Sequence, residues 1–514
     1  MKRFLFLLIG VAAVVTLLTV PASAADFKFG GMFWTKYYST SNTTDGSDGS
    51  IGPQKTSGDD NLNAFYTRMR LYFTATASEN LQAVFKYELD DVWGNGRLGT
   101  TSADGGSLGR SDSSQPGANT GGEVKNMYIQ FNMPNTPLTF MVGVLPAKLG
   151  TGLAFNDDTN GIVAIAKFDM FKLTGVYSRL QDNSNPSFAA VPTAISPTNT
   201  AVNAIATTAF QAPNTPETPF TSSDDWDLWA ASLRFNPMKE LSLDLSGTWI
   251  NTSLQDTSGT FPGKNDMNLY NVVLDADYKG DIFGIYFTGG KNFGSLETDA
   301  GDLDFTGWQL EAGGTVTMGP VVIGVDGYYS SEIKYNEDGD EYTGYLTPGV
   351  DGRNTYNMDE IVFPGWFDDY SATITGTFTG AGNQQAATNF TNLTATGMTR
   401  TNAGYVPTNI WAVGAHVDFK PFEKTLLQAG GAWLQFVEDV PSETTTGLSP
   451  TSKAQVRAED NVIGTSVYLR LSQGIVDGLE LKAAFGYLFA DDAFTPNNND
   501  DDAYKFATGL FWSW

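Results

Sequence analysis

The sequence of 514 residues contains no cysteine and only one histidine, and charged residues make up just 17% of it, against about 25% in an average globular protein. Without cysteine there is no disulfide framework, no thiol chemistry and no thiolate zinc site. A single histidine cannot build a histidine metal centre, because such a centre needs several imidazole ligands. We therefore expect no metal and no cofactor.

Long hydrophobic runs are also missing after the N-terminal segment, so the sequence predicts no membrane-spanning helix. The apolar stretch Phe4–Leu18 follows Lys2 and Arg3 and precedes the small-residue motif Ala22-Ser23-Ala24, which is the pattern of a secretory signal peptide. We predict that residues 1–24 are a cleaved signal peptide and that the mature chain, 25–514, is exported across the inner membrane. An uncleaved membrane anchor is disfavoured, because the apolar run is short and the cleavage motif is good.

Aromatic residues, at 13%, and 55 glycines are abundant, yet the mean hydropathy is only −0.19. Apolar and polar residues alternate along 241–249, 411–419 and 479–487, which predicts strands with one apolar and one polar face. A soluble sandwich also shows this alternation. The strands here are long, however, and aromatic residues cluster near strand ends. Such clusters are typical of the two interfaces of a membrane barrel. The clusters are Trp34, Tyr37 and Tyr38 at one end of the chain and Phe511, Trp512 and Trp514 at the other.

Short and long connections alternate along the chain, as they do between the periplasmic turns and extracellular loops of outer-membrane barrels. The sequence therefore predicts an all-β fold, a transmembrane antiparallel up-and-down β-barrel of about 18 strands, with 16 as the nearest alternative. We expect the long loops at 39–61, 93–122, 145–160, 181–225, 252–266, 295–302, 333–407, 439–457 and 492–502 to face outward. Region 333–407 is long enough for another hairpin, since 361–363 and 372–378 look strand-like.

The C-terminal residues Gly509-Leu510-Phe511-Trp512-Ser513-Trp514 resemble the terminal signal that the barrel-assembly machinery reads in outer-membrane proteins. Ala507 and the final tryptophan depart from the usual pattern. The mature chain as a whole resembles the porins of Gram-negative bacteria, and its size is also similar to alginate-export and sugar-specific barrels. The resemblance implies an outer-membrane location, passive diffusion of ions and small hydrophilic solutes, and a homotrimer. It also implies contacts with outer-membrane lipid, lipopolysaccharide and the assembly machinery.

Acidic residues dominate the charge, since loss of Lys2 and Arg3 with the signal peptide takes the formal net charge from −27 to −29. This charge argues against nucleic acid as a partner. Because the acidic residues lie mainly in the loops, we expect weak cation selectivity that falls at high salt. The acidic run 336–341 does not fit a calcium-loop spacing, so solvated loops are favoured over a calcium site. Divalent cations bridging these loops to lipopolysaccharide phosphates stay open.

The polar faces of the predicted strands carry charged residues, as expected for a water-filled lumen. Our candidates for the lumen and its constriction are Arg68, Arg70, Lys86, Glu88, Lys148, Asp157, Asp158, Arg234 and Arg470. The third long loop, 145–160, contains apolar residues that would be poorly placed in water, and two glycines that permit an inward fold. We expect this loop to narrow the pore, with Asp157 and Asp158 facing Arg68 and Arg70. An ordinary surface hairpin is the alternative.

The sequence leaves two other functions and an enzymatic role as alternatives to a porin. Polar-face tyrosines at 66, 72, 128 and 328 could form a sliding path for an oligosaccharide or another polymer. A wide lumen without an inward loop would instead favour a structural sleeve around a partner protein. His416 lies on a polar strand face with Gly414 and Asp418, so a lumen-lining residue is favoured over a catalytic one. We therefore predict that the chain is not an enzyme.

Overall fold

A computed structural model of the chain describes residues 26–41, 61–92, 122–181, 226–255, 264–298, 301–332, 341–347, 358–361, 363, 366–367, 410–437, 461–491 and 502–514. The predicted signal peptide, residues 1–24, lies outside this part, as do most of the predicted long loops. Within the described residues, no helix is long and apolar enough to cross a membrane.

The described elements are all strands, joined into one sheet. They are β1 (Asp26–Ser41), β2 (Asn61–Ser78), β3 (Leu81–Val92), β4 (Gly122–Asn132), β5 (Leu138–Leu149), β6 (Phe155–Lys167), β7 (Phe171–Gln181), β8 (Trp226–Met238), β9 (Leu241–Gln255), β10 (Lys264–Lys279), β11 (Phe283–Thr298), β12 (Gly301–Phe305), β13 (Trp308–Met318), β14 (Val321–Ser330), β15 (Glu341–Tyr342), β16 (Ile410–Phe422), β17 (Thr425–Phe436), β18 (Val462–Val476), β19 (Leu479–Ala490) and β20 (Ala503–Ser513).

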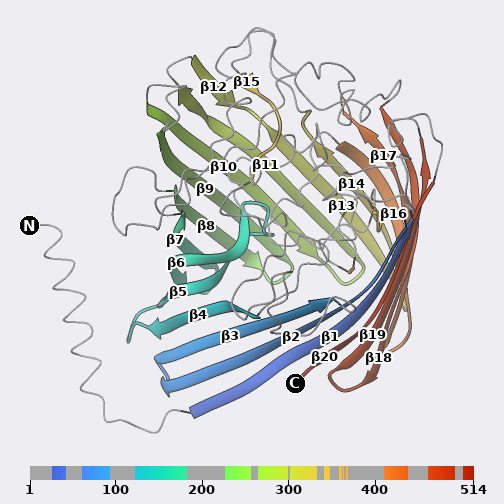
Figure 1. The fold of residues 1–514 in the computed structure, drawn as a ribbon, viewed down its shortest axis with the longest axis horizontal. Helices are drawn as coiled ribbons and strands as arrows, with labels where there is room; N and C mark the ends of the chain where they lie inside the picture. The colour runs from blue at the N-terminus through green and yellow to red at the C-terminus, as the bar shows by residue number, and fades with distance from the viewer. Residues whose placement is uncertain are drawn as a thin grey trace, which may run out of the picture.

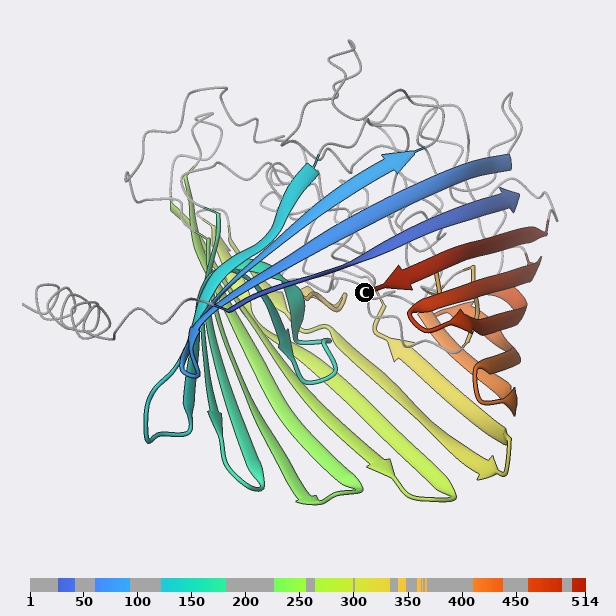
Figure 2. The same ribbon diagram turned by 90° about the horizontal axis from the view of Figure 1, so that it is seen from below.

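Each wall strand pairs antiparallel with the next, and β20 pairs with β1, so the sheet closes into a barrel (Figures 1 and 2). Figure 2 shows β20, in red, beside β1, in dark blue. β12 and β13 form one wall strand interrupted at Thr306 and Gly307, while β15 pairs in parallel with β12 and is not part of the wall. The prediction of an antiparallel barrel of about 18 strands is confirmed.

Strand alternation gives the barrel an apolar outer face and a polar inner one. Leu233, Leu245 and Leu274 lie directly opposite one another on β8, β9 and β10 and are exposed. The adjacent positions Asp244 and Ser246 are buried inside. Backbone groups in lipid must all be paired, and a closed sheet pairs them. The barrel therefore has the construction of a membrane-spanning barrel of the outer-membrane type.

The aromatic clusters predicted for the membrane interfaces divide between the two faces. Trp512 and Trp514 are exposed, as expected for an outer-face position, whereas Phe511 lies on the inner face beside Phe367 and does not fit the prediction. Trp34 and Tyr38 are buried on the inner face instead, because they occupy the even positions of β1 together with Lys36. The interpretation of this N-terminal cluster as an interface girdle is therefore wrong for two of its three residues.

Tight turns connect alternate strands at one end of the barrel, and the outer ends of β1 and β20 lie at this same end. Between two of these turns, Lys424 donates a hydrogen bond to Asp477 at 2.7 Å, which holds the pKa of the aspartate below its usual value. The short connections predicted from the sequence are thus confirmed as turns, among them Glu79–Asn80 and Gly319–Pro320.

Two expectations about loops are wrong. The predicted loop 145–160 is mostly strand, because β5 runs to Leu149 and β6 starts at Phe155. Two stretches of region 333–407, namely 341–347 and 358–367 where described, are buried against the inner wall rather than lying outside. Ile361 and Phe363 are not in a strand, and 372–378 lies outside the described residues. Large barrels leave interior space that wall side chains cannot fill, so loop segments can occupy it.

An arginine in place of Leu245 tests the assignment of the outer face. Leu245 is 51% exposed and faces lipid in the leucine row. Leu245→Arg should destabilise the barrel by about 2–4 kcal/mol, the cost of a cation facing the bilayer interior. Reversible urea unfolding in lipid vesicles measures this change, with Leu245→Ile as the control. Equal stability of the two variants would contradict the assignment.

Candidate functional site: the lumen and its inward segments

The β5–β6 hairpin leaves the wall at a pair of glycines. Gly143 and Gly161 lie directly opposite each other. From this glycine pair toward Leu138 and Ala166, β5 pairs with β4 and β6 pairs with β7. In the other direction, residues 145–160 pair only with one another. Gly143 has φ +135°, and a Cβ on Gly161 would lie 2.0 Å from the carbonyl oxygen of Tyr177. Only glycine tolerates both positions, so the sequence places a bend here, and the hairpin turns into the barrel (Figure 1).

One face of the inward hairpin is apolar and packs against the inner wall. Leu149, Leu153 and Phe155 are each at most 1% exposed. They belong to a cluster with wall residues from β7 to β11, including Leu228 and Ile250. Burial of such side chains stabilises the inward position by about 1.5–3 kcal/mol each. The apolar residues of 145–160 therefore lie where water is excluded.

Polar contacts fix the tip of the hairpin to the same part of the wall, on β8 to β11. The backbone N–H and the hydroxyl of Thr151 donate to the two carboxylate oxygens of Asp275, at 2.9 and 2.8 Å. Thr288 donates to the same carboxylate at 2.7 Å. Arg234 donates to Asp244 at 3.1 Å and reaches the carbonyl oxygen of Gly150 at 3.5 Å. Gly150 has φ +55° and no room for a side chain, because Asp275 lies against it.

The second face of the hairpin carries the polar candidates. Lys148 is exposed and lies opposite Asn156, and Pro146 lies opposite Asp158. Asp157 is on the wall side instead and is only 7% exposed. Strand alternation separates these neighbouring aspartates, so the expectation that both face the same basic residues is wrong. Asp158 forms an ion pair with Lys125 at 2.9 Å and accepts a hydrogen bond from Asn126 at 2.8 Å, and both partners lie on β4.

The candidates on β2 and β3 form one charged group. Arg68 and Arg70 both pair with Glu88, and the Arg68–Glu88 distance is 3.3 Å. Lys86 lies on the same face, over the ring of Tyr72 at 5.5 Å. Next to them, a β-bulge in β4 turns Lys125 inward, although strict alternation would point it outward. Arg68 and Arg70 thus lie near Asp158 without being its partners.

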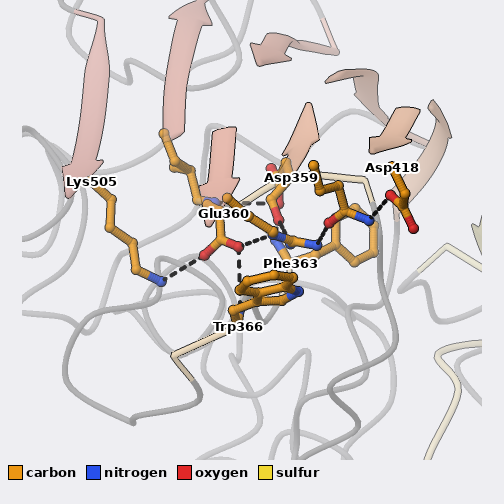
Figure 3. Close-up of polar contacts among 9 residues, drawn as sticks. Asp359, Glu360, Phe363, Trp366, Asp418 and Lys505 are labelled. Atoms are coloured by element: carbon orange, nitrogen blue, oxygen red, sulfur yellow. Dashed lines mark hydrogen bonds and ion pairs between the residues drawn. The ribbon is translucent and has the colours of Figure 1, made fainter. Parts of the chain in front are cut away.

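Arg470 belongs to a second charged group, where it pairs with an acidic residue of the buried stretch of region 333–407. Glu360 is 1% exposed and pairs with Arg470, which is also 1% exposed. The ammonium of Lys505 lies 3.8 Å from the same carboxylate. Arg470 further donates to the carbonyl oxygen of Asp359 at 3.0 Å and to the amide oxygen of Gln428 at 2.7 Å. In Figure 3, Lys505 approaches Glu360 from one side, and the row of polar contacts ends at Asp418 on the other.

Residues 341–347 pack against the inner wall at β10 and β11. Leu346 accepts from Asn292 at 2.8 Å through its carbonyl oxygen and donates to it at 2.7 Å through its N–H. Tyr345 exchanges hydrogen bonds with Asn271. Thr347 donates to the carbonyl oxygen of Leu153 at 3.0 Å, which joins this stretch to the inward hairpin. One long loop and one hairpin thus form a connected structure inside the barrel.

Most basic residues of the lumen wall lie on one arc and most acidic residues on another, although Glu88 lies among the basic ones and Arg234 beside Asp244. The basic arc spans the contiguous strands β18, β19, β20 and β1 to β4 and contains Arg470, Lys482, Lys505, Lys36, Arg68, Arg70, Lys86 and Lys125. The acidic arc spans β9 to β16 and contains Asp244, Asp275, Glu311, Asp326 and Asp418. His416 lies in this arc, where it contacts Asp326 at 2.9 Å. The lumen-lining interpretation of His416 agrees with this position.

Sequence reasoning missed three charged residues of the lumen. Lys36 lies on a strand whose strongest sequence feature is its aromatic residues, and a bulge reverses the side of Lys125. Glu360 was overlooked because its surroundings looked strand-like. A usable signal existed for Glu360, since large apolar residues are concentrated within the ten positions 358–367, namely Met358, Ile361, Phe363, Trp366 and Phe367.

Comparison with known proteins identifies the fold. No protein-family model and no curated protein sequence matches the chain. Among solved structures, OccAB3 of Acinetobacter baumannii is 9% identical, with a TM-score of 0.50 over 95% of this chain and 99% of that one. A BenF-like porin of Pseudomonas fluorescens is 10% identical, with a TM-score of 0.46 over 95% and 98%. The outer membrane protein OprD of Pseudomonas aeruginosa is 7% identical, with a TM-score of 0.47 over 96% and 95%.

At this level of identity the likeness concerns the fold. Together with the closed barrel and its apolar outer face, it defines the class of the molecule. The chain is an outer-membrane β-barrel with the fold of the porins, as the sequence predicted.

Removing the carboxylate of Asp275 tests how the hairpin tip is held. Asp275→Ala deletes the acceptor of three hydrogen bonds, and a hydrogen bond to a charged group contributes about 1.5–3 kcal/mol. Amide hydrogen exchange at Thr151 should then be at least about tenfold faster. Asp277→Ala on the same strand is the control, because Asp277 pairs with Lys279 near a turn. Unchanged exchange at Thr151 would show that the tip is held by its apolar face alone.

Proposed function

We propose that the protein is a porin through which ions and small hydrophilic solutes diffuse passively across the outer membrane. The observation that carries this proposal is a barrel whose inner face holds charged residues in two opposed arcs. A barrel with a packed, purely structural interior does not need charged residues of both signs along its inner face. A polar channel uses such charges to select solutes. We assign no catalytic residue.

The inward hairpin is proposed to be the constriction. Its apolar face rests on the wall from β7 to β11, and its polar face, with Lys148 and Asp158, is directed away from that wall. The charged group on β2 and β3, with Arg68, Arg70, Lys86 and Glu88, lies near Asp158. Arg234 would help to hold the tip of the hairpin in place, through its contact with the carbonyl oxygen of Gly150. These contacts support a narrow, charged passage beside the hairpin.

The two arcs would place solutes in a transverse electric field. Charges interact more strongly where water is partly excluded, so a dipolar solute would be oriented as it passes. Acidic loops at the mouth would raise the local cation concentration, while the basic arc opposes cations inside. We therefore propose weak cation selectivity overall.

The alternative functions have less support. A polymer path would need a continuous row of lumen aromatics, but Tyr328 is buried beneath Phe363. The side chain of Tyr66 lies outside the described part. A sleeve for a partner protein would need an open interior, whereas the hairpin and the inward loop occupy it. For partners beyond lipid and solutes, we propose lipopolysaccharide, the assembly machinery and two further copies in a homotrimer.

Reversal potentials in planar bilayers test the proposed function. In a salt gradient, the purified barrel should conduct ions with a weak cation preference. This preference should decline as salt is raised, because the Debye length shortens from about 10 Å at 0.1 M to about 3 Å at 1 M. An insulating barrel would contradict the porin function, and a clear anion preference would contradict the assigned role of the acidic loops.

A pair of isosteric substitutions tests the constriction. Asp158→Asn should shift the permeability ratio toward anions by up to about fivefold at low salt, because it removes a charge beside the passage. Asp157→Asn is the matched control, since this carboxylate faces the wall and should leave the ratio nearly unchanged. Equal effects of the two substitutions, or no effect of Asp158→Asn, would place the constriction elsewhere.

A further inference from the structure

The described residues 358–361, 363 and 366–367, called the inner segment below, lie across the lumen face of β16 to β20 and β1. Met358, Ile361 and Phe363 pack with apolar wall residues such as Ile410 and Leu488. Phe367 packs separately, with wall residues of β1, β19 and β20. The wall supplies this apolar surface on its otherwise polar inner face, so it is shaped to receive the segment.

Two wall glycines show the same fit at atomic distances. A Cβ on Gly486 would lie 2.7 Å from the Cβ of Glu360, and a Cβ on Gly414 would lie 3.4 Å from Cγ of Met358. Neither glycine has a positive φ, so their own backbone conformation does not demand glycine. The close approach of the inner segment explains the absence of a side chain at Gly486.

Side chains supply the polar attachments of the inner segment to the wall. Tyr38 donates to the carbonyl oxygen of Phe367 at 3.3 Å, and Arg470 donates to that of Asp359 at 3.0 Å. Glu360 adds the charged contacts to Arg470 and Lys505. Inside the segment, the carboxylate of Asp359 accepts from the N–H of Phe363 at 2.8 Å, so Asp359 holds the local shape. Glu360 is therefore the charged link between this folded segment and the wall.

Glu360 also shields two cationic side chains, those of Arg470 and Lys505, from water. With the segment in place, Glu360, Arg470 and Lys505 have side chains that are each 1% exposed. Buried charges are tolerated only when they are paired, and loss of one partner leaves the others at a high cost. Without Glu360, the two cations would favour a state in which water reaches them. Such a state requires the inner segment to leave the wall.

We propose that the inner segment is a lid within the lumen and that Glu360 is its latch. In the docked state the passage is narrow, and Arg470 and Lys505 are covered. In the released state the passage is wider, and both cations face the water and attract anions. This inference rests on the proposed porin function, and it adds a second, wider conducting state to it.

Two substitutions with different physical actions should produce the released state. Glu360→Gln removes the charge of the latch and keeps its shape. Gly486→Val keeps the charge and displaces the segment by its bulk. Each should raise single-channel conductance by about twofold and shift the permeability ratio toward anions by up to about fivefold at low salt. Gly175→Val is the control, because a Cβ on this outer-face glycine would meet no atom within 4 Å.

The outcomes separate the lid from simpler roles. Conductance equal to wild type in both variants overturns the lid and leaves the porin function intact. A shift in selectivity caused by Glu360→Gln alone, with no change in conductance, also overturns it and reduces Glu360 to a fixed counter-charge. Heat-modifiable mobility on gels verifies that each variant is a folded barrel.

A cysteine measurement tests the lid without relying on conduction, because the chain has no other cysteine. Met358 is fully buried, so Met358→Cys should react slowly with a water-soluble thiol reagent. Adding Glu360→Gln should speed this reaction by at least about tenfold. Equal rates would overturn the lid. A disulfide between Met358→Cys and Gly414→Cys should abolish the conductance gain of Glu360→Gln until it is reduced, and a gain that persists under oxidation would also overturn it.

Discussion

The pairing of backbone groups in lipid is the constraint on which this structure depends. No water in the hydrocarbon core can satisfy an open N–H or C=O, so the strands must close on themselves. With about 18 strands, closure leaves an interior too wide for wall side chains to fill. The polar inner face, the inward hairpin and the inner segment are all responses to this space. The outer face needs only apolar side chains, which explains why its leucine row is so simple.

Inside the barrel, glycine positions decide where loop segments can come close. Gly143 and Gly161 let the hairpin bend away from the wall, and Gly486 lets Glu360 approach it. Charged residues then fix what the glycines permit, since Asp275 holds the hairpin tip and Arg470 holds the inner segment. The glycines thus allow the backbone to take an inward path, and the buried charged residues select one position along that path.

The sequence was sufficient for the barrel itself, because period-two alternation and turn residues are local signals. It also indicated the inward fold of 145–160, through apolar residues that had no place in water. The same signal in Met358 and Phe363 was misinterpreted as a strand. Side-chain direction was less accessible: a single bulge turns Lys125 inward, and alternation sends Asp157 to the wall and Asp158 to the passage. The partners of Glu360 lie 110 and 145 residues away along the chain, and no local pattern encodes such a pairing.

Because the β5–β6 hairpin bends away from the wall, it also limits how far the bilayer can extend along this side of the barrel. Within the part of the chain that the structure describes, residues 122–126 of β4 pair only with β3 beyond the Gly143–Gly161 pair, and β7 beyond Ser178 pairs only with β8. The wall therefore has a notch with two strand edges, bridged by side chains such as Asn126 to Asp158 and Ser178 to the carbonyl oxygen of Asn160. Acyl chains cannot satisfy the edge groups that remain. On this side of the barrel, the hydrocarbon layer must end at the glycine pair or closer to the tight turns. The bend that shapes the lumen therefore also sets the position of the membrane–water interface on the outside.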